Sequence, residues 1–142
     1  MKKELKRPTG TELYATLTLE KQNDLIFLDW NGYLNLELVK AGSEELLVWI
    51  KQHKVTRVLV DNSKVSGTWQ AANSWYETDW NPRAAKEGLA FMAIIMSDNV
   101  FTQLSAQGFV KVTKGLYTVN IFNGAPQART WLAEQKTAAV AK

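Results

Sequence analysis

Two short, fully apolar runs constrain the fold of this chain more than any other feature. Thr56–Asp61 carries Val58, Leu59 and Val60 in succession, and Leu89–Met96 is apolar throughout. Both are strand-sized, and a continuous apolar run is typical of a strand that is covered on both faces. Such strands occur mainly in parallel sheets flanked by helices. We therefore expect an α/β fold with these two segments at its centre.

Alternating patterns predict a β-hairpin before the first of these runs. Leu13–Leu19 and Ile26–Trp30 carry an apolar residue at every second position, and the polar Lys21–Asp24 between them is suited to a turn. A helix is then predicted with Asn35 as its N-cap, and it should end near His53.

Three further helices are predicted in the second half. Trp69–Trp80 has aromatic residues at helical spacing, and Asn81-Pro82 should stop that helix. A closing helix should begin at Gly124-Ala125-Pro126, after a last strand at Thr118–Phe122. The helix between Met96 and that strand should be capped by Ser97 or Asp98 and end before Gly108. Its expected inward face consists of Val100, Phe101 and Leu104.

The predicted order of elements is ββαβαβαβα. This order indicates an α/β mixed sheet of about five strands with a parallel centre and with helices packed on it. The chain length suits one domain, which we assign to residues 11–136. Residues 1–10 are interpreted as a flexible basic arm, and residues 137–142 as a tail that frays.

The charges are concentrated at the start of the chain. Four of the 17 basic side chains (Lys2, Lys3, Lys6 and Arg7) and one of the 14 acidic ones (Glu4) account for the net charge of +3. The remaining 13 basic and 13 acidic side chains cancel, so we expect no nucleic-acid partner. No apolar run is long enough to span a membrane, and the first ten residues lack the apolar core of a secretory signal. We expect a cytoplasmic protein.

The motifs of the common catalytic and cofactor sites are missing. The sequence has no dinucleotide fingerprint, no P-loop and no zinc-protease motif. It has no cysteine, and His53, at a predicted helix end, is its one histidine. The acidic pairs Glu44/Glu45 and Glu77/Asp79 do not converge on one helix face. We therefore expect no catalytic set, no metal and no cofactor.

The most informative segment for function is Asp61–Thr68, interpreted as a turn between a central strand and a helix. In open α/β sheets, ligands bind beyond the carboxyl ends of the strands, and helix N-termini present free amides. The same polar side chains can also stabilise a purely structural turn. Trp75 lies off the face shared by Trp69, Tyr76 and Trp80, so an exposed Trp75 would indicate a lipophilic pocket or an interface. The candidate binding residues are Asp61, Asn62, Ser63, Ser66, Gly67, Thr68 and Trp75.

Several of these features, in this order, resemble the STAS-like superfamily and its SpoIIAA-like branch over residues 11–135. The features are Trp30-Asn31-Gly32, the strand VLVD at 58–61, the polar loop with Gly67, the aromatic helix ending at Trp80, Gly88, and Phe122 followed by Ala128-x-x-Trp131-Leu132. The resemblance implies an α/β sheet with helices packed on it, self-association such as a homodimer, and a non-enzymatic regulatory role.

Classical members of that family are switched by phosphorylation of a serine near this loop, and Ser63 and Ser66 are the candidates here. The family's Asp-Ser-Ser-Gly-Leu run is replaced by Ser66-Gly67-Thr68-Trp69. Some related domains are associated with lipid or other hydrophobic ligands. The leading hypothesis is thus a regulatory or ligand-binding module whose contact surface is the Asp61–Thr68 turn and the helix that follows. The alternatives are a small hydrolase-like enzyme using Asp61, Ser63 or Glu77, and an adaptor that binds an anionic partner through Lys2–Arg7.

Overall fold

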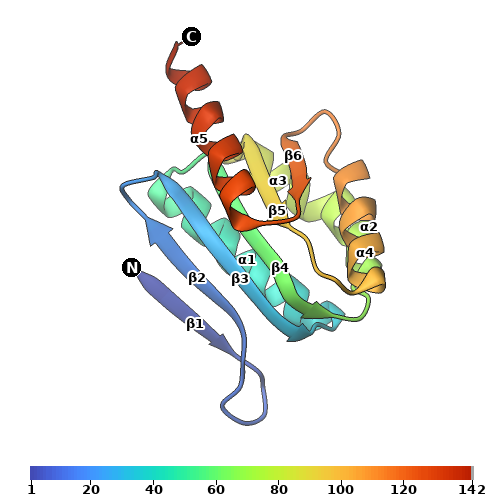
Figure 1. Cartoon of the computed structure of the whole chain (residues 1–142). Coiled ribbons are helices and arrows are strands. Elements are labelled where there is room, and N and C mark those ends of the chain that lie inside the picture. Colours follow the sequence, from blue (N-terminus) through green and yellow to red (C-terminus); the bar gives the residue numbers. More distant parts are fainter. Residues whose placement is uncertain (142) are drawn as a thin grey trace.

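A six-stranded mixed sheet forms the centre of the computed structural model, which describes the backbone of residues 1–141 and the side chains of residues 1–135 (Figure 1). The strands are adjacent in chain order: β1 (Lys2–Lys6), β2 (Leu13–Glu20), β3 (Leu25–Tyr33), β4 (Arg57–Ser66), β5 (Phe91–Ile95) and β6 (Thr118–Phe122). β1, β2 and β3 pair antiparallel, and β3 to β6 pair parallel. The predicted α/β class with a parallel centre is confirmed.

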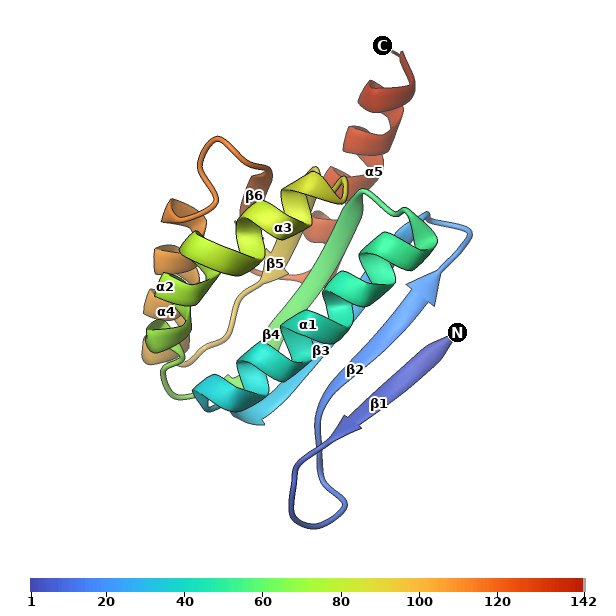
Figure 2. The same ribbon diagram turned by 180° about the vertical axis from the view of Figure 1, so that it is seen from behind.

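Helices cover the two faces of the sheet unequally. α1 (Leu36–His53), the segment from α2 (Asn73–Trp75) to α3 (Asn81–Lys86), and α4 (Val100–Lys111) lie on one face (Figure 2). α5 (Ala125–Ala141) crosses the other face over β4, β5 and β6. Because α5 leaves β1 and β2 uncovered on that face, the hairpin strands alternate polar and apolar residues, whereas β4 and β5 are apolar on both sides.

The apolar residues form one core on each face of the sheet. The larger core lies under α1, α3 and α4 and includes Val58, Val60 and the fully buried Trp80. The smaller core lies under α5 and joins Leu59 to Leu132. Successive residues of β4 thus enter opposite cores, which is the burial predicted from its continuous apolar run.

The basic segment at the start of the chain differs from the prediction of a flexible arm. Lys2–Lys6 form the edge strand β1, which pairs antiparallel with β2 from Lys2 opposite Thr18 to Lys6 opposite Leu13. The pairing explains why six strands are found rather than about five. Leu5 packs against the larger core, and Lys3 forms an ion pair with Glu45. Lysine side chains on an edge strand also discourage pairing with further chains.

The predicted aromatic helix is an irregular helical run that continues past its expected end. A 3-10 turn at Gln70–Ala72 leads into α2, a π-helical turn at Tyr76–Trp80 and then α3. Pro82 was expected to stop the helix, but it occupies the first turn of α3. Proline is tolerated there because first-turn residues need no donor for a helical hydrogen bond.

Helix α4 is rotated relative to the prediction. Val100, Phe101 and Leu104, expected to face inward, are each more than half exposed, while Thr102, Ser105, Ala106 and Phe109 are buried. The reason is a demand for hydrogen bonds: Thr102 Oγ1 donates to the Gly67 carbonyl at 2.7 Å, and Ser105 Oγ accepts from the Trp69 amide at 3.0 Å. Asn99 is the N-cap in place of Ser97 or Asp98, and the helix continues through Gly108.

Both ends of α1 match the prediction from the sequence. Asn35 caps α1 as predicted, accepting a hydrogen bond from the Leu38 amide at 2.8 Å, and α1 ends at His53. The frayed tail expected at residues 137–142 lies outside the residues whose side chains are described. Among the described residues, no helix is long and apolar enough to cross a membrane.

Candidate functional site

The segment expected to be a turn, Asp61–Ser66, is the second half of strand β4. Asp61 pairs with Asp29 and Lys64 with Asn31, so β4 has one more residue than β3 between these two pairs. This β-bulge is closed locally, because the Asp61 carboxylate accepts a hydrogen bond from the Ser63 amide at 2.8 Å. The polar side chains that resembled a turn therefore stabilise a bulge, and the chain leaves the sheet only at Gly67, where φ is +82°.

Asn62 follows Val58 and Val60 at every second position of β4, so ordinary strand alternation turns it into the interior. Asn62 and Val65 both lie on the face that packs against the helices, and the extra residue, Ser63, is exposed. Asn62 is only 3% exposed. Its side-chain amide has no hydrogen-bond partner among the described residues. The polar atoms that are fully shielded from solvent and lack a partner in the described part of the chain do not include those of Asn62, so its amide keeps a small contact with solvent.

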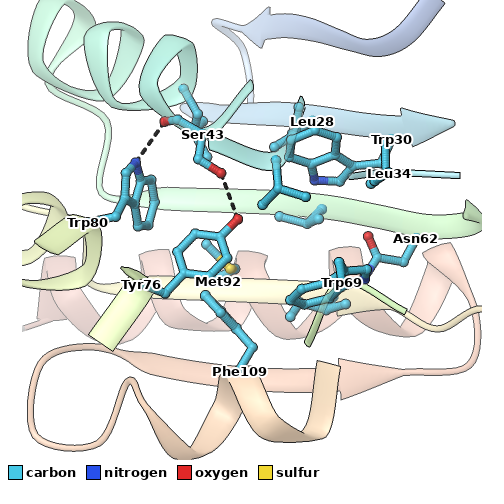
Figure 3. A pocket seen from close by; sticks show the side chains of 14 residues that line it. Leu28, Trp30, Leu34, Ser43, Asn62, Trp69, Tyr76, Trp80, Met92 and Phe109 are labelled. Carbon is cyan, nitrogen blue, oxygen red and sulfur yellow. Dashed lines mark hydrogen bonds between the residues drawn. The ribbon is translucent and has the colours of Figure 1, made fainter. Parts of the chain in front are cut away.

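Asn62 lines a pocket between the sheet and the helices that cover it (Figure 3). The pocket has a volume of about 40 Å³. Its other walls come from β3 (Leu28, Trp30), the start of α1 with the preceding Leu34 (Val39, Ser43, Leu46), β4 and β5 (Val60, Met92, Ile94), the irregular run (Trp69, Tyr76, Trp80) and α4 (Phe109). Leu28, Val60 and Met92 each belong to the first half of their strand, so the pocket lies over the middle of the sheet and not beyond the carboxyl ends of its strands, where α/β sheets usually bind ligands.

A set of hydrogen bonds around Ser43 builds one wall of the pocket. The Ser43 and Tyr76 hydroxyls are 2.6 Å apart, and the Trp80 indole Nε1 donates to the Ser43 carbonyl at 2.7 Å (Figure 3). Burial raises the pKa of the Tyr76 phenol well above its usual value, although the Ser43 bond opposes that shift. Tyr76 is therefore neutral at physiological pH. No carboxylate, lysine, arginine or histidine lines this pocket.

Trp69 separates the pocket from solvent. Thirteen of the fourteen lining residues are buried, and Trp69 alone is partly exposed. Its ring meets Tyr76 and Phe109 edge-on, with centroids 6.4 and 6.3 Å away. Its indole Nε1 is buried without a hydrogen-bond partner in the described part of the chain. Trp69 and Asn62 both line the apolar pocket, and each carries a polar group without a hydrogen-bond partner among the described residues.

Neither models of known protein families nor curated protein sequences match this chain.

The structure separates the residues predicted for the site. Asn62 alone of them lines the pocket. Asp61 points to the opposite face of the sheet, where Lys64 forms an ion pair with Asp29 at 2.8 Å and lies 3.8 Å from Asp61. Ser63, Ser66 and Thr68 are exposed, and Gly67 is half-buried. No hydrogen bond joins the Ser63 hydroxyl to Asp61 within the described residues, so these side chains do not form a serine–carboxylate pair.

Trp75, the other predicted site residue, is half-buried outside the pocket. It packs against Tyr76 at 5.2 Å between ring centroids, and the Lys40 ammonium lies 5.7 Å from its ring. The sequence reasoning instead missed Ser43 and regarded Trp69 as core. One signal pointed to Ser43: it interrupts the apolar stripe Val39, Leu46 and Ile50 of α1 with a hydroxyl. Among the described residues, no group of acidic or histidine side chains is placed to hold a metal ion.

Proposed function

We propose that this chain is a non-enzymatic, STAS-like binding module that takes a small, mostly apolar molecule into the pocket behind Trp69. The observation that carries this proposal is that two residues of one apolar pocket carry polar groups without a hydrogen-bond partner among the described residues: the fully buried Trp69 indole N–H, and the Asn62 amide, which keeps a small contact with solvent. Small-molecule sites combine apolar walls with a few convergent polar groups in this way. A hydroxyl or carbonyl group of the ligand would accept from Trp69 and pair with Asn62.

The size of the pocket requires Trp69 to move when such a ligand binds. A volume of about 40 Å³ accommodates water molecules, which need roughly 10–15 Å³ each, but is smaller than the ~150 Å³ cavity known to hold benzene. The other thirteen walls are buried in the core, whereas Trp69 is partly exposed and follows the loop at Ser66–Thr68. Rotation of Trp69 toward solvent is therefore the way to enlarge the site with the least repacking.

The same motion supports a regulatory role. Tyr33 is exposed beside the loop, and its ring lies where a side chain on Gly67 would be. Displacement of Trp69 by a ligand would shift this loop and so alter the surface that Tyr33 and Thr68 present. A regulatory protein or a second copy of the chain that docks there would sense whether the pocket is occupied. This mechanism needs neither a catalytic group nor a phosphorylated serine.

A series of primary alcohols from 1-butanol to 1-octanol tests the pocket directly. We expect the Trp69 indole N–H resonance to shift and saturate, with affinity rising with chain length until the pocket is filled. Asn62→Leu, which keeps the volume but removes the amide, should weaken binding at least fivefold. Trp75→Phe is the matched control, and its affinity should stay within twofold of the native protein. The absence of a saturable shift at Trp69 for every alcohol would refute the proposal.

The natural ligand requires a separate measurement. Native mass spectrometry of the protein purified from its own host should show an additional mass that is lost in Asn62→Leu. It also reports the oligomeric state and any phosphorylation of Ser63 or Ser66. Species free of added mass, together with the absence of alcohol binding, would leave Asn62 as a purely structural feature.

A further inference from the structure

A second unusual group lies at the opposite end of β4, on the face covered by α5. Arg57, the first residue of the strand, is 3% exposed, so its charged side chain is almost fully buried. Its guanidinium donates to the Leu132 carbonyl of α5 at 2.8 Å, to the Asp24 carbonyl at 3.1 Å, and to the Asn23 carbonyl. All three acceptors are neutral backbone groups.

The charge of Arg57 is not neutralised by direct contact. Within the part of the chain that the structure describes, no carboxylate forms an ion pair with it. Burial lowers the pKa of the Arg57 guanidinium, and the Asp24 carboxylate opposes this only from a longer distance. Three hydrogen bonds also leave two of the five N–H groups without a described acceptor. Buried arginines are normally paired, so this site has an unmet need for an anion.

A cleft of about 480 Å³ opens against this guanidinium, between the β2–β3 turn and α5. Its walls are Gln22, Asn23, Leu25, Arg57, Arg129, Thr130 and Ala133. None of them is acidic, and their amide and hydroxyl groups supply further hydrogen-bond donors. In Figure 1 the β2–β3 turn and the start of β4 lie at the end of the sheet opposite to the loop that leads from β4 toward α2. The cleft is therefore separate from the pocket behind Trp69.

Arg129 contributes a second guanidinium to the cleft wall, and Glu20 holds this group in one orientation. Its two Nη atoms each donate to a Glu20 oxygen at 2.8 Å, and the group lies 5.7 Å from the Phe27 ring. Glu20 is not part of the cleft wall. An anion entering the cleft would therefore face two arginines, of which Arg129 has a carboxylate partner and Arg57 has backbone carbonyls alone. The planar fork of arginine suits the paired oxygens of carboxylate and phosphate groups.

We propose that this cleft is an anion-binding site, in which Arg57 and Arg129 hold the carboxylate or phosphate group of a small molecule. Gln22, Asn23 and Thr130 would bind the rest of its polar surface. The proposal is independent of the ligand proposed for the pocket behind Trp69, since it uses none of that pocket's residues. It assigns the protein a second, chemically different ligand.

Removing Arg57 would not give a clean test, because the same side chain fastens the hairpin turn and α5. A nearly isosteric variant avoids this difficulty. Gln22→Glu places a tethered carboxylate at the cleft, whereas Gln127→Glu makes the same charge change on α5 outside it. Both residues are exposed, so neither variant should disturb the core.

The measurement is an NMR titration with inorganic phosphate and, separately, with succinate, each against chloride at equal ionic strength. In the native protein and in Gln127→Glu, we expect saturable shifts of the Arg57 Nε–H and Thr130 amide signals, with affinities within twofold of each other. Gln22→Glu should weaken the affinity at least tenfold. A saturable response to either anion supports the site. Shifts that match chloride for both anions, or an affinity unchanged in Gln22→Glu, would overturn it.

Discussion

The pocket behind Trp69 and the cleft beside Arg57 lie on opposite faces of strand β4, and they bury polar groups in opposite ways. In the pocket, the neutral Asn62 amide has no partner among the described residues, yet the surrounding core is closely packed. In the cleft, the charged Arg57 has three backbone acceptors. An unpaired amide costs about 1–3 kcal/mol, but an isolated buried charge costs several times more. A small domain can thus leave a neutral group free for a ligand, whereas a buried charge must be partly satisfied by the fold itself.

The largest effect is expected when a charged side chain replaces the neutral Asn62 in the pocket. Asn62→Asp should lower the free energy of unfolding by about 4 kcal/mol at pH 8, because burial raises a carboxyl pKa by about 3 units in such a site. The raised folded-state pKa means that stability is retained at low pH and lost as the pH rises. Urea unfolding at pH 4.5 and pH 8 measures the difference.

Asn62→Leu is the control for that variant. It fills the same space without a polar group, so its stability should equal that of the native protein or exceed it by about 1 kcal/mol. A loss of stability in Asn62→Asp that is equal at both pH values would show that the amide is accessible to water and that the pocket is not dry.

Alkaline pH should destabilise the fold mainly through the buried tyrosines on the face of the sheet that carries the pocket. Burial raises the pKa of Tyr76 and of Tyr117, whose hydroxyl donates to Asn81 Oδ1 at 2.7 Å. Both phenols stay protonated in the folded state above pH 10, where the unfolded chain ionises. Stability is therefore complete below about pH 10 and should fall by roughly 1.4 kcal/mol per pH unit for each tyrosine above it.

Unfolding free energies measured between pH 9 and pH 11 test this slope. Tyr76→Phe and Tyr117→Phe should each remove part of it, and burial also raises the pKa of the Tyr14 phenol, which accounts for a further part. A slope that is unchanged in both variants would place the alkaline transition elsewhere, for instance at the arginine and lysine ion pairs of the exposed surface.

The fold was predictable wherever local pattern and tertiary packing agree. The apolar run Val58–Val60 demanded burial on both faces, and Asn35 could cap only the helix that follows it. The rotation of α4 was not predictable, because hydrophobicity alone turns Phe101 and Leu104 inward. The carbonyls of Val65 and Gly67 needed donors, and Ser97 and Thr102 meet that need only after the chain has folded.

The sequence named one residue of the pocket, and the pocket's other walls were not assigned to a site from the sequence. Of the residues predicted from the segment after the central apolar run, Asn62 is the one that lines the pocket. The bulge that brings Val65 to the same face as Asn62 depends on the pairing of β4 with β3 and has no signature within its own segment. The burial of Arg57 could not be predicted from the sequence either, since an arginine at the start of a strand ordinarily points to solvent.

The smallest expected effect on stability concerns the ion pair between Glu20 and Arg129, beside the cleft. The hydrogen bonds from Arg129 lower the pKa of Glu20, more than burial raises it. The pair therefore stabilises the fold at neutral pH, and this contribution is lost as the pH falls below about 4.5 through the lowered folded-state value. Because both side chains are partly exposed, Glu20→Gln should cost only about 0.5–1 kcal/mol at pH 7 and almost nothing at pH 3. Urea unfolding at the two pH values measures it.

Glu12→Gln is the matched control, since Glu12 is exposed and lies 3.9 Å from Arg7, at the outer limit of an ion pair. Its effect on stability should be smaller still. The two variants also differ in a second way if the cleft binds anions. Glu20 and an added anion compete for Arg129, so Glu20→Gln should tighten phosphate binding a few-fold, while Glu12→Gln should leave it unchanged. Equal phosphate affinity in both variants would mean that Arg129 remains bound to Glu20 and that the charge of Arg57 alone attracts the anion.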